Sequence, residues 1–197
     1  MRPPRAWVFD LDGTLTVAQH DFAAIKRELG LPPESPVLEG IAAAPAADRA
    51  RLLDAVHRWE LDLAAHARPN PGAAELLARL RARGLPLGVL TRNTSAIAWR
   101  TLEVTRLAWA FARADVLGRE DTSPKPAPDG VLALASRWGV PPAELVVVGD
   151  FRFDLDAARA AGAQAVWLDS DGTGEFASLA DRVVRGLAEL ADLAAGP

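Results

Sequence analysis

Two aspartates near the start of the chain, Asp10 and Asp12, are separated by one leucine and followed by Gly13. Carboxylates held close together repel each other, so one resists ionisation unless a cation is near. Such a pair can divide the work of a reaction: an ionised Asp10 attacks, while Asp12 donates a proton and later accepts one. On a continuing strand the two side chains would point to opposite sides, but Gly13 permits a turn that brings Asp12 back. The alternative is an ordinary turn, in which Asp and Gly are common.

Polar residues also follow three later apolar runs. They are Thr91, Arg92 and Asn93 after residues 86–90, Asp150 after residues 145–148, and Asp169 and Asp171 after residues 163–168. In an open parallel sheet, ligands bind beyond the carboxyl ends of the strands. We therefore expect these side chains to lie at the same edge as Asp10.

The scaffold that positions these residues is predicted from the apolar runs themselves. Residues 6–9, 86–90, 145–148 and 163–168 are short and continuously apolar, which is typical of strands buried on both faces. Each of the last three runs follows a segment of helical periodicity that ends at a glycine. Strands that alternate with helices predict an α/β fold with a doubly wound parallel sheet. Residues 183–184 are a candidate edge strand, followed by a helix over residues 187–193.

One stretch interrupts the alternation. Residues 17–70 show helical patterns and no convincing strand, with breaks at Pro32, Pro33 and Pro36. The segment 69–72, Pro-Asn-Pro-Gly, marks the return to the sheet. We predict a core domain of residues 1–16 and 71–197, and a small helical cap, residues 17–70, inserted after the first strand.

Composition excludes several classes of function. The 197 residues suit one domain with a small insertion, and 50% of them are hydrophobic, which permits a sizeable core. The net charge is −4 and the basic residues are spread out, so we expect no nucleic-acid partner. The absence of cysteine rules out disulfides, thiolate nucleophiles and thiolate zinc sites. The apolar run near the N-terminus ends at Asp10, too short for a signal peptide or a membrane span, so we predict a cytoplasmic protein.

Four segments together resemble the signatures of the haloacid dehalogenase-like (HAD) hydrolase superfamily, in the family's order. Residues 10–14, Asp-Leu-Asp-Gly-Thr, resemble the first, Thr91 the second, Lys125 within Ser-Pro-Lys-Pro the third, and residues 149–154, Gly-Asp-Phe-Arg-Phe-Asp, the fourth. The resemblance covers nearly all of the chain outside residues 17–70. It points to the phosphoglycolate phosphatase-like and β-phosphoglucomutase-like branch, for which this cap is short, and implies a Rossmann-like core.

The resemblance also implies catalytic roles. Asp10 attacks phosphorus and forms an aspartyl-phosphate, and Asp12 protonates the leaving alcohol and then activates water. Thr91 hydrogen-bonds a phosphoryl oxygen, and Lys125 neutralises the phosphate and the nucleophile. Two alternatives stay open from the residues alone: Thr91 as a helix cap and Lys125 as a solvated loop lysine.

A magnesium ion is the implied cofactor. The carboxylates of Asp10 and Asp150 and the backbone carbonyl of Asp12 would hold it, and all-oxygen ligation with retained waters is what Mg²⁺ prefers. Asp154 would not bind the ion directly but would orient a metal-bound water or Lys125. The alternative for Asp154 is an acid at the start of a helix, where the macrodipole favours it.

Substrate contacts are predicted at five positions. Gly13 and Thr14 lie in the loop after Asp12, and His20 lies where the cap begins. Arg92 could grip a second anionic group of the substrate, or pair with a carboxylate of the protein. Asn93 could donate a hydrogen bond to the substrate, or cap the following helix.

These features predict a Mg²⁺-dependent phosphatase that hydrolyses a small phosphorylated metabolite through an aspartyl-phosphate. Asp12 favours phosphatase over dehalogenase chemistry, because a departing halide needs no proton. A phosphomutase or phosphotransferase uses the same residues and stays an alternative. A receiver-like phosphoacceptor domain is an alternative of a different class, but the acid two residues after Asp10 and the inserted cap argue against it. The oligomeric state is left open.

Overall fold

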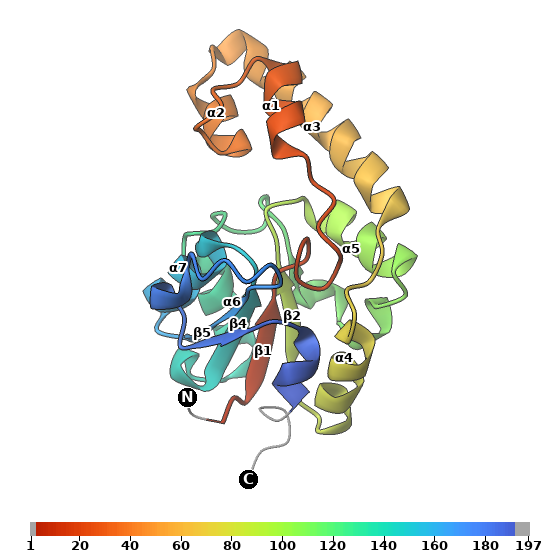
Figure 1. Ribbon diagram of the computed structural model, residues 1–197, viewed down its shortest axis with the longest axis vertical. Coiled ribbons are helices and arrows are strands. Elements are labelled where there is room, and N and C mark those ends of the chain that lie inside the picture. The colour runs from red at the N-terminus through yellow and green to blue at the C-terminus, as the bar shows by residue number, and fades with distance from the viewer. Residues whose placement is uncertain (1–2, 192–197) are drawn as a thin grey trace.

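The computed structural model describes residues 3–191 and contains a parallel sheet with the strand order β3-β2-β1-β4-β5-β6 (Figure 1). The strands are β1 (Ala6–Phe9), β2 (Leu87–Leu90), β3 (Val116–Leu117), β4 (Leu145–Gly149), β5 (Gln164–Leu168) and β6 (Arg182–Val184). The first strand lies in the middle and pairs with β2 on one side and β4 on the other. The predicted doubly wound α/β fold is therefore confirmed.

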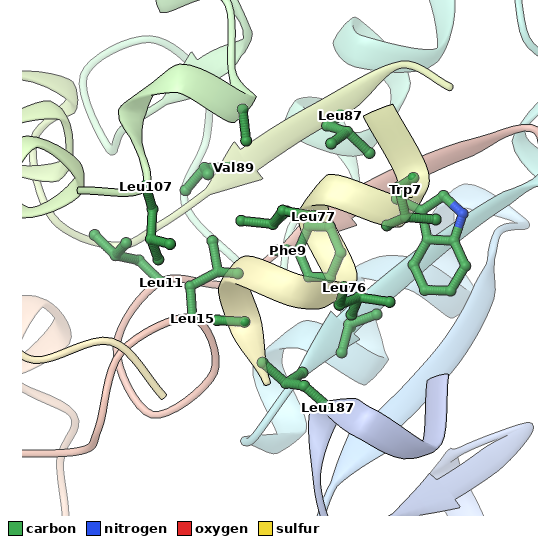
Figure 2. Packing of buried hydrophobic residues seen from close by; sticks show 14 of the residues in the cluster. Trp7, Phe9, Leu11, Leu15, Leu76, Leu77, Leu87, Val89, Leu107 and Leu187 are labelled. Carbon is green, nitrogen blue, oxygen red and sulfur yellow. The ribbon is translucent and has the colours of Figure 1, made fainter. Parts of the chain in front are cut away.

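The strands are continuously apolar because both faces of the sheet are covered. In β1, Trp7 and Phe9 face one hydrophobic core, whereas Ala6 and Val8 face the other. Helices α4 (Ala73–Ala82) and α5 (Ser95–Val104) cover the first face, and α6 (Asp129–Trp138) and α7 (Arg152–Ala161) cover the second. Figure 2 shows the first core, where leucines of α4 lie over the rings of β1. Burial on both sides removes the polar–apolar alternation of a half-exposed strand.

Most of the predicted elements agree with the observed ones to within one or two residues. The strand β3 was missed, because its two residues are too few to form a visible apolar run. The predicted helix over residues 187–193 is a 3-10 helix over Leu187–Leu190, and residues 192–193 lie outside the described residues. Within residues 3–191, no helix combines the length and the apolar character needed to cross a membrane.

Of the four helices between β1 and β2, the first three lie beyond the carboxyl ends of the strands (Figure 1). They are α1 (Phe22–Leu29), α2 (Val37–Ala43) and α3 (Ala46–His66), and they share a small core of Leu31, Ile41, Leu52 and Val56. The segments that lead to and from them are hydrogen-bonded to each other, since the Val17 N–H donates to the Arg68 carbonyl at 3.0 Å. We therefore keep residues 17–70 as the proposed cap.

The loop after β3 fixes the start of α5, and through it the residues that follow β2. The Arg119 N–H donates to the Asn93 carbonyl at 2.9 Å. A Cβ added at Gly118 would lie 2.2 Å from the backbone nitrogen of Ser95 and 2.7 Å from the carbonyl carbon of Thr94. Only glycine permits this approach without moving backbone atoms.

The substitution Gly118→Ala should lower the free energy of unfolding by about 1–3 kcal/mol, the usual cost of overpacking. Chemical denaturation followed by circular dichroism measures this change. Gly186→Ala is the matched control, because nothing lies within 4 Å of its added Cβ. The control should change stability by less than about 0.5 kcal/mol. Equal stability of the two variants would contradict the proposed contact.

Candidate active site

The loop after β1 carries Asp10 and Asp12 to the carboxyl edge of the sheet. The Asp10 N–H donates to the Val148 carbonyl of β4 at 2.9 Å, which continues the pairing of β1 with β4. The loop then closes on itself, because the Gly13 N–H donates to the Thr16 carbonyl at 2.9 Å. Gly13 has a φ of +90°, and a Cβ there would lie 2.1 Å from a carboxylate oxygen of Asp150. Glycine is therefore required both for the turn and for the approach of Asp150.

A buried lysine bridges two of the carboxylates. Lys125 is 3% exposed, and its Nζ lies 2.5 Å from Asp10 Oδ1 and 2.6 Å from Asp154 Oδ1. The other oxygen of Asp154 accepts the Phe151 N–H at 3.2 Å at the start of α7. Both predictions for Asp154 therefore hold: it is an acid at the start of a helix, and it contacts Lys125. The solvated alternative for Lys125 is wrong.

Three carboxylates lie close enough to share a divalent cation. Asp10, Asp150 and Asp154 each offer an oxygen, and these oxygens all lie within 4.8 Å of one another. Burial, followed by the charges of Asp10 and Asp154, raises the pKa of Asp150 to about 8. A cation would relieve this repulsion, and a donor set made only of oxygen suits Mg²⁺. The residues therefore fit the predicted ion, with Asp154 as an additional carboxylate near it.

Asp12 lies beside this cluster and is set up to hold a proton. The Asn93 side chain donates to Asp12 Oδ2 at 2.8 Å. Burial raises the pKa of Asp12 to about 7, with Lys125 opposing the rise and Glu60 of α3 adding to it. Near neutral pH, Asp12 therefore exists in both protonation states, as an acid and base must. Asn93, predicted as a substrate contact, here contacts Asp12.

Thr91 is 3% exposed and follows β2 directly. Its hydroxyl oxygen accepts the Asn93 N–H at 3.1 Å, which leaves the hydroxyl proton available to another acceptor. The side chain that caps α5 is Thr94, which accepts the Ile97 N–H at 3.3 Å. The alternatives in which Thr91 or Asn93 caps this helix are therefore wrong.

The guanidinium of Arg92 is bound by the protein itself. It donates to both carboxylate oxygens of Glu39 on α2, at 2.6 and 2.7 Å, and to the Lys125 carbonyl at 2.6 Å. It also lies 4.6 Å from the centre of the Phe153 ring. Of the two predicted interpretations, the structure shows the pairing with a protein carboxylate.

A second arginine joins the core to the cap. Arg119 donates to both carboxylate oxygens of Glu60 on α3, at 2.6 and 2.9 Å, and to the Arg92 carbonyl at 2.9 Å. Both side chains are mostly buried. Glu39, Glu60 and Arg119 were not predicted from the sequence. A glutamate on a cap helix that pairs with an arginine of the core has the same local sequence pattern as a glutamate on a solvent-exposed helix face.

A cavity of about 420 Å³ lies between the sheet edge and the cap. Of the site residues predicted from the sequence, nine line this cavity: Asp10, Asp12, His20, Thr91, Arg92, Asn93, Lys125, Asp150 and Asp154. Gly13 and Thr14 do not line it. Thr14 is fully buried, and its hydroxyl lies 3.4 Å from Asp150 Oδ1, so it supports that carboxylate instead.

Asp169 and Asp171, which were predicted to lie at the same edge of the sheet as Asp10, lie apart from this cavity. The Asp169 carboxylate accepts the N–H groups of Gly172, Thr173 and Gly174 and pairs with Arg185 at 3.2 Å. Asp171 is exposed in the same loop. The expectation that all the polar residues after the strands gather near Asp10 is therefore wrong for these two, because the loop after β5 turns its acid onto its own backbone.

His20 is half-buried in an aromatic group with Phe22 and Trp59 of the cap. Its ring stacks on Phe22 at 5.1 Å between centroids and meets Trp59 edge-on at 5.2 Å. Burial lowers the pKa of His20, with Glu60 opposing the change. A neutral imidazole is therefore the favoured form at neutral pH.

Comparison with known proteins agrees with this geometry. The family model for haloacid dehalogenase-like hydrolases matches residues 4–162. Phosphoglycolate phosphatase of Escherichia coli O157:H7 is 32% identical over 161 residues, which cover 80% of this chain and 61% of that protein. The chain thus spans about three-fifths of the length of this relative. An uncharacterized hydrolase of Saccharomyces cerevisiae is 31% identical over 203 residues, covering 96% of this chain and 90% of its own.

Among solved structures, a hydrolase from Pseudomonas syringae superposes with a TM-score of 0.79 at 28% identity, covering 95% of this chain and 96% of its own. The family model covers most of the chain and all four signature segments. The chain therefore belongs to the haloacid dehalogenase-like hydrolase family.

Proposed function

We propose that this chain is a Mg²⁺-dependent phosphatase that hydrolyses a small phosphorylated metabolite through an aspartyl-phosphate on Asp10. The observation that carries the proposal is the buried Lys125, which bridges Asp10 and Asp154 on the floor of a cavity that Asp12 also lines. The name of the phosphoglycolate phosphatase relatives supports phosphate-ester chemistry. A cytoplasmic location stays a prediction from the sequence.

The charge on Lys125 sets the state of the nucleophile. Burial alone would lower the pKa of Lys125, but Asp10 and Asp154 hold it above its usual value, so the ammonium persists. Burial raises the pKa of Asp10, and the ammonium at 2.5 Å opposes that rise. The ion pair therefore favours an anionic Asp10, the form that can attack phosphorus.

The two half-reactions follow from the positions of the acids. In the first, an oxygen of Asp10 bonds to phosphorus while the ester bond breaks, and Asp12 gives its proton to the departing alcohol. In the second, Asp12 takes a proton from water as that water attacks phosphorus, which releases phosphate and restores Asp10. The free hydroxyl proton of Thr91 is available to a phosphoryl oxygen in both steps.

The proposed ion would be held by the carboxylates of Asp10 and Asp150 and by the backbone carbonyl of Asp12. When bound, it would offset the negative charge of the phosphoryl group and the surrounding acids. Asp154 would keep Lys125 in place, because one of its oxygens is 2.6 Å from the ammonium.

The family match and the cap over Asp10 support a hydrolase over a receiver-like phosphoacceptor. A phosphomutase would use the same acids, and no contact in the described residues favours it over a phosphatase.

Replacing the nucleophile by its isostere, Asp10→Asn, should lower kcat on para-nitrophenyl phosphate by on the order of a thousandfold or more, because the amide cannot attack phosphorus. Steady-state assays with Mg²⁺ measure this loss. Asp156→Asn is the matched control, since Asp156 pairs with Arg152 on α7 and does not line the cavity. Wild-type turnover by a clean, folded Asp10→Asn preparation would refute the assignment.

The role of Asp12 predicts a dependence on the leaving group. Asp12→Asn should lower kcat/KM for an alkyl phosphate by about a hundredfold to ten-thousandfold, because the alkoxide needs a proton. The loss for para-nitrophenyl phosphate should be much smaller, since that phenolate departs unprotonated. Equal losses for both esters would show that Asp12 does not protonate the leaving group.

Mg²⁺ binding should weaken as pH falls through about 8, because Asp150, with its raised pKa, must lose a proton to bind the ion. The rise in melting temperature on adding Mg²⁺ should therefore be larger at about pH 8.5 than at about pH 6.5. Asp150→Asn should abolish the rise, whereas Asp171→Asn, in an exposed loop, should keep it. A rise that is independent of pH, or that survives Asp150→Asn, would contradict this ligand set.

A further inference from the structure

Much of the wall of the cavity is apolar. On the cap side, Phe22 and Trp59 line it, and on the core side, Phe151 and Phe153 do so. Phe22 is 53% exposed and Phe151 is 46% exposed, although both are large hydrophobic side chains. Apolar surface left open beside a reactive centre favours a ligand that covers it.

The rings are held in place by one another. On the cap, Phe22 and Trp59 meet at a centroid distance of 5.8 Å and an interplanar angle of 68°. On the core, Phe151 and Phe153 meet at 5.0 Å and 79°. Such edge-on contacts are favourable for aromatic pairs. A ligand would therefore meet walls that are already ordered, and little side-chain entropy would be lost on binding.

The arginine of this lining and the lysine beside Asp10 are already paired with carboxylates of the protein. The Arg92 guanidinium is bound by Glu39, and the Lys125 ammonium by Asp10 and Asp154. The remaining lysine of the lining, Lys26, donates to the Pro33 carbonyl and shares the wall with the carboxylate of Glu34. Among the described residues, no arginine fork is open toward the cavity to receive a carboxylate or a second phosphate.

The size of the cavity favours a leaving group larger than a short alcohol. Its volume of about 420 Å³ is within the usual range for ligand pockets and exceeds what a phosphoryl group with a two-carbon alcohol would fill. A small leaving group would leave water against the phenylalanine and tryptophan rings. A ring-sized group would displace that water, which is favourable at apolar surfaces.

We propose that the substrate is a phosphate monoester whose alcohol carries a flat apolar ring and no second anionic group, bound between the cap rings, Phe22 and Trp59, and the core rings, Phe151 and Phe153. This inference rests on the phosphatase function proposed above and defines the class of its substrate. It sets this chain apart from its phosphoglycolate phosphatase relatives, since glycolate is small and carries a carboxylate.

Three esters with similar alkyl leaving groups test the inference: benzyl phosphate, ethyl phosphate and phosphoglycolate. With Mg²⁺ present, kcat/KM for benzyl phosphate should exceed that for ethyl phosphate by about tenfold to a hundredfold, the gain expected from burying a ring. Phosphoglycolate should be the poorest of the three, because its carboxylate would meet no free cation fork.

Variants of the two walls show whether the rings cause this preference. Phe22→Ala should lower kcat/KM for benzyl phosphate by about fivefold or more and change that for ethyl phosphate by less than about twofold. Phe151→Ala, on the opposite wall, should do the same and provides a second measurement if Phe22→Ala disturbs the cap. Trp109→Ala is the control. Trp109 is 54% exposed and lies outside the cavity, so kcat/KM should be unchanged for both benzyl phosphate and ethyl phosphate.

The outcomes separate the two proposals. If neither para-nitrophenyl phosphate nor any of the three esters is hydrolysed, the phosphatase function is overturned and the inference with it. If only para-nitrophenyl phosphate is hydrolysed, the inference alone is overturned. If the three esters are hydrolysed but phosphoglycolate is as good a substrate as benzyl phosphate, only the inference is overturned. Equal losses for benzyl and ethyl phosphate in both ring variants would also overturn it.

Discussion

The structure depends on a single ammonium group placed among carboxylates that would otherwise repel one another. Asp10, Asp12, Asp150 and Asp154 converge on one edge of the sheet, and burial makes each of them harder to ionise. Lys125 lies between Asp10 and Asp154 and is itself almost fully buried. A buried charge pair of this kind is costly to break, because either partner left alone would be an uncompensated charge. The repulsion that remains around Asp150 favours a cation in the same place.

The fold supplies this arrangement through adjacent strands. Asp10 follows β1 and Asp150 follows β4, and these strands are paired residue by residue up to Phe9 and Val148. Their carboxyl ends are therefore level, and the acids that follow them meet without further adjustment. The loop before α6 supplies Lys125, and the first turn of α7 supplies Asp154. Three separate segments, residues 10–12, the loop at Lys125 and residues 149–154, thus bring their charges together, and oxygens of Asp10, Asp150 and Asp154 all lie within 4.8 Å of one another.

The sequence was sufficient for five of the six strands, for the flanking helices α4, α6 and α7, and for the floor of the site, because each of these depends on local patterns. Continuous apolar runs predicted β1, β2, β4 and β5, and the four signature segments predicted Lys125 and Asp150 at the site. What it missed depends on contacts between distant segments. The pairing of Arg92 with Glu39 joins residues 53 positions apart, and that of Arg119 with Glu60 joins residues 59 apart. The local sequence around Glu39 or Glu60 does not identify the arginine with which it pairs. The apolar walls of the cavity come from both the cap and the core, so they can be recognised only when the two are placed together.

The central position of β1 has a consequence for how the protein is made. This strand is translated before the other five, yet its neighbour β4 lies some 140 residues later in the chain, with Ala6 paired to Leu145. Until the ribosome has released β4, one edge of β1 has no partner, and Asp10 has neither Asp150 nor Asp154 beside it. Pairings of such long sequence separation form slowly, because the entropy of closing the intervening loop is lost before the contacts are gained. The growing chain therefore carries its nucleophile well before the residues that complete the centre have been made.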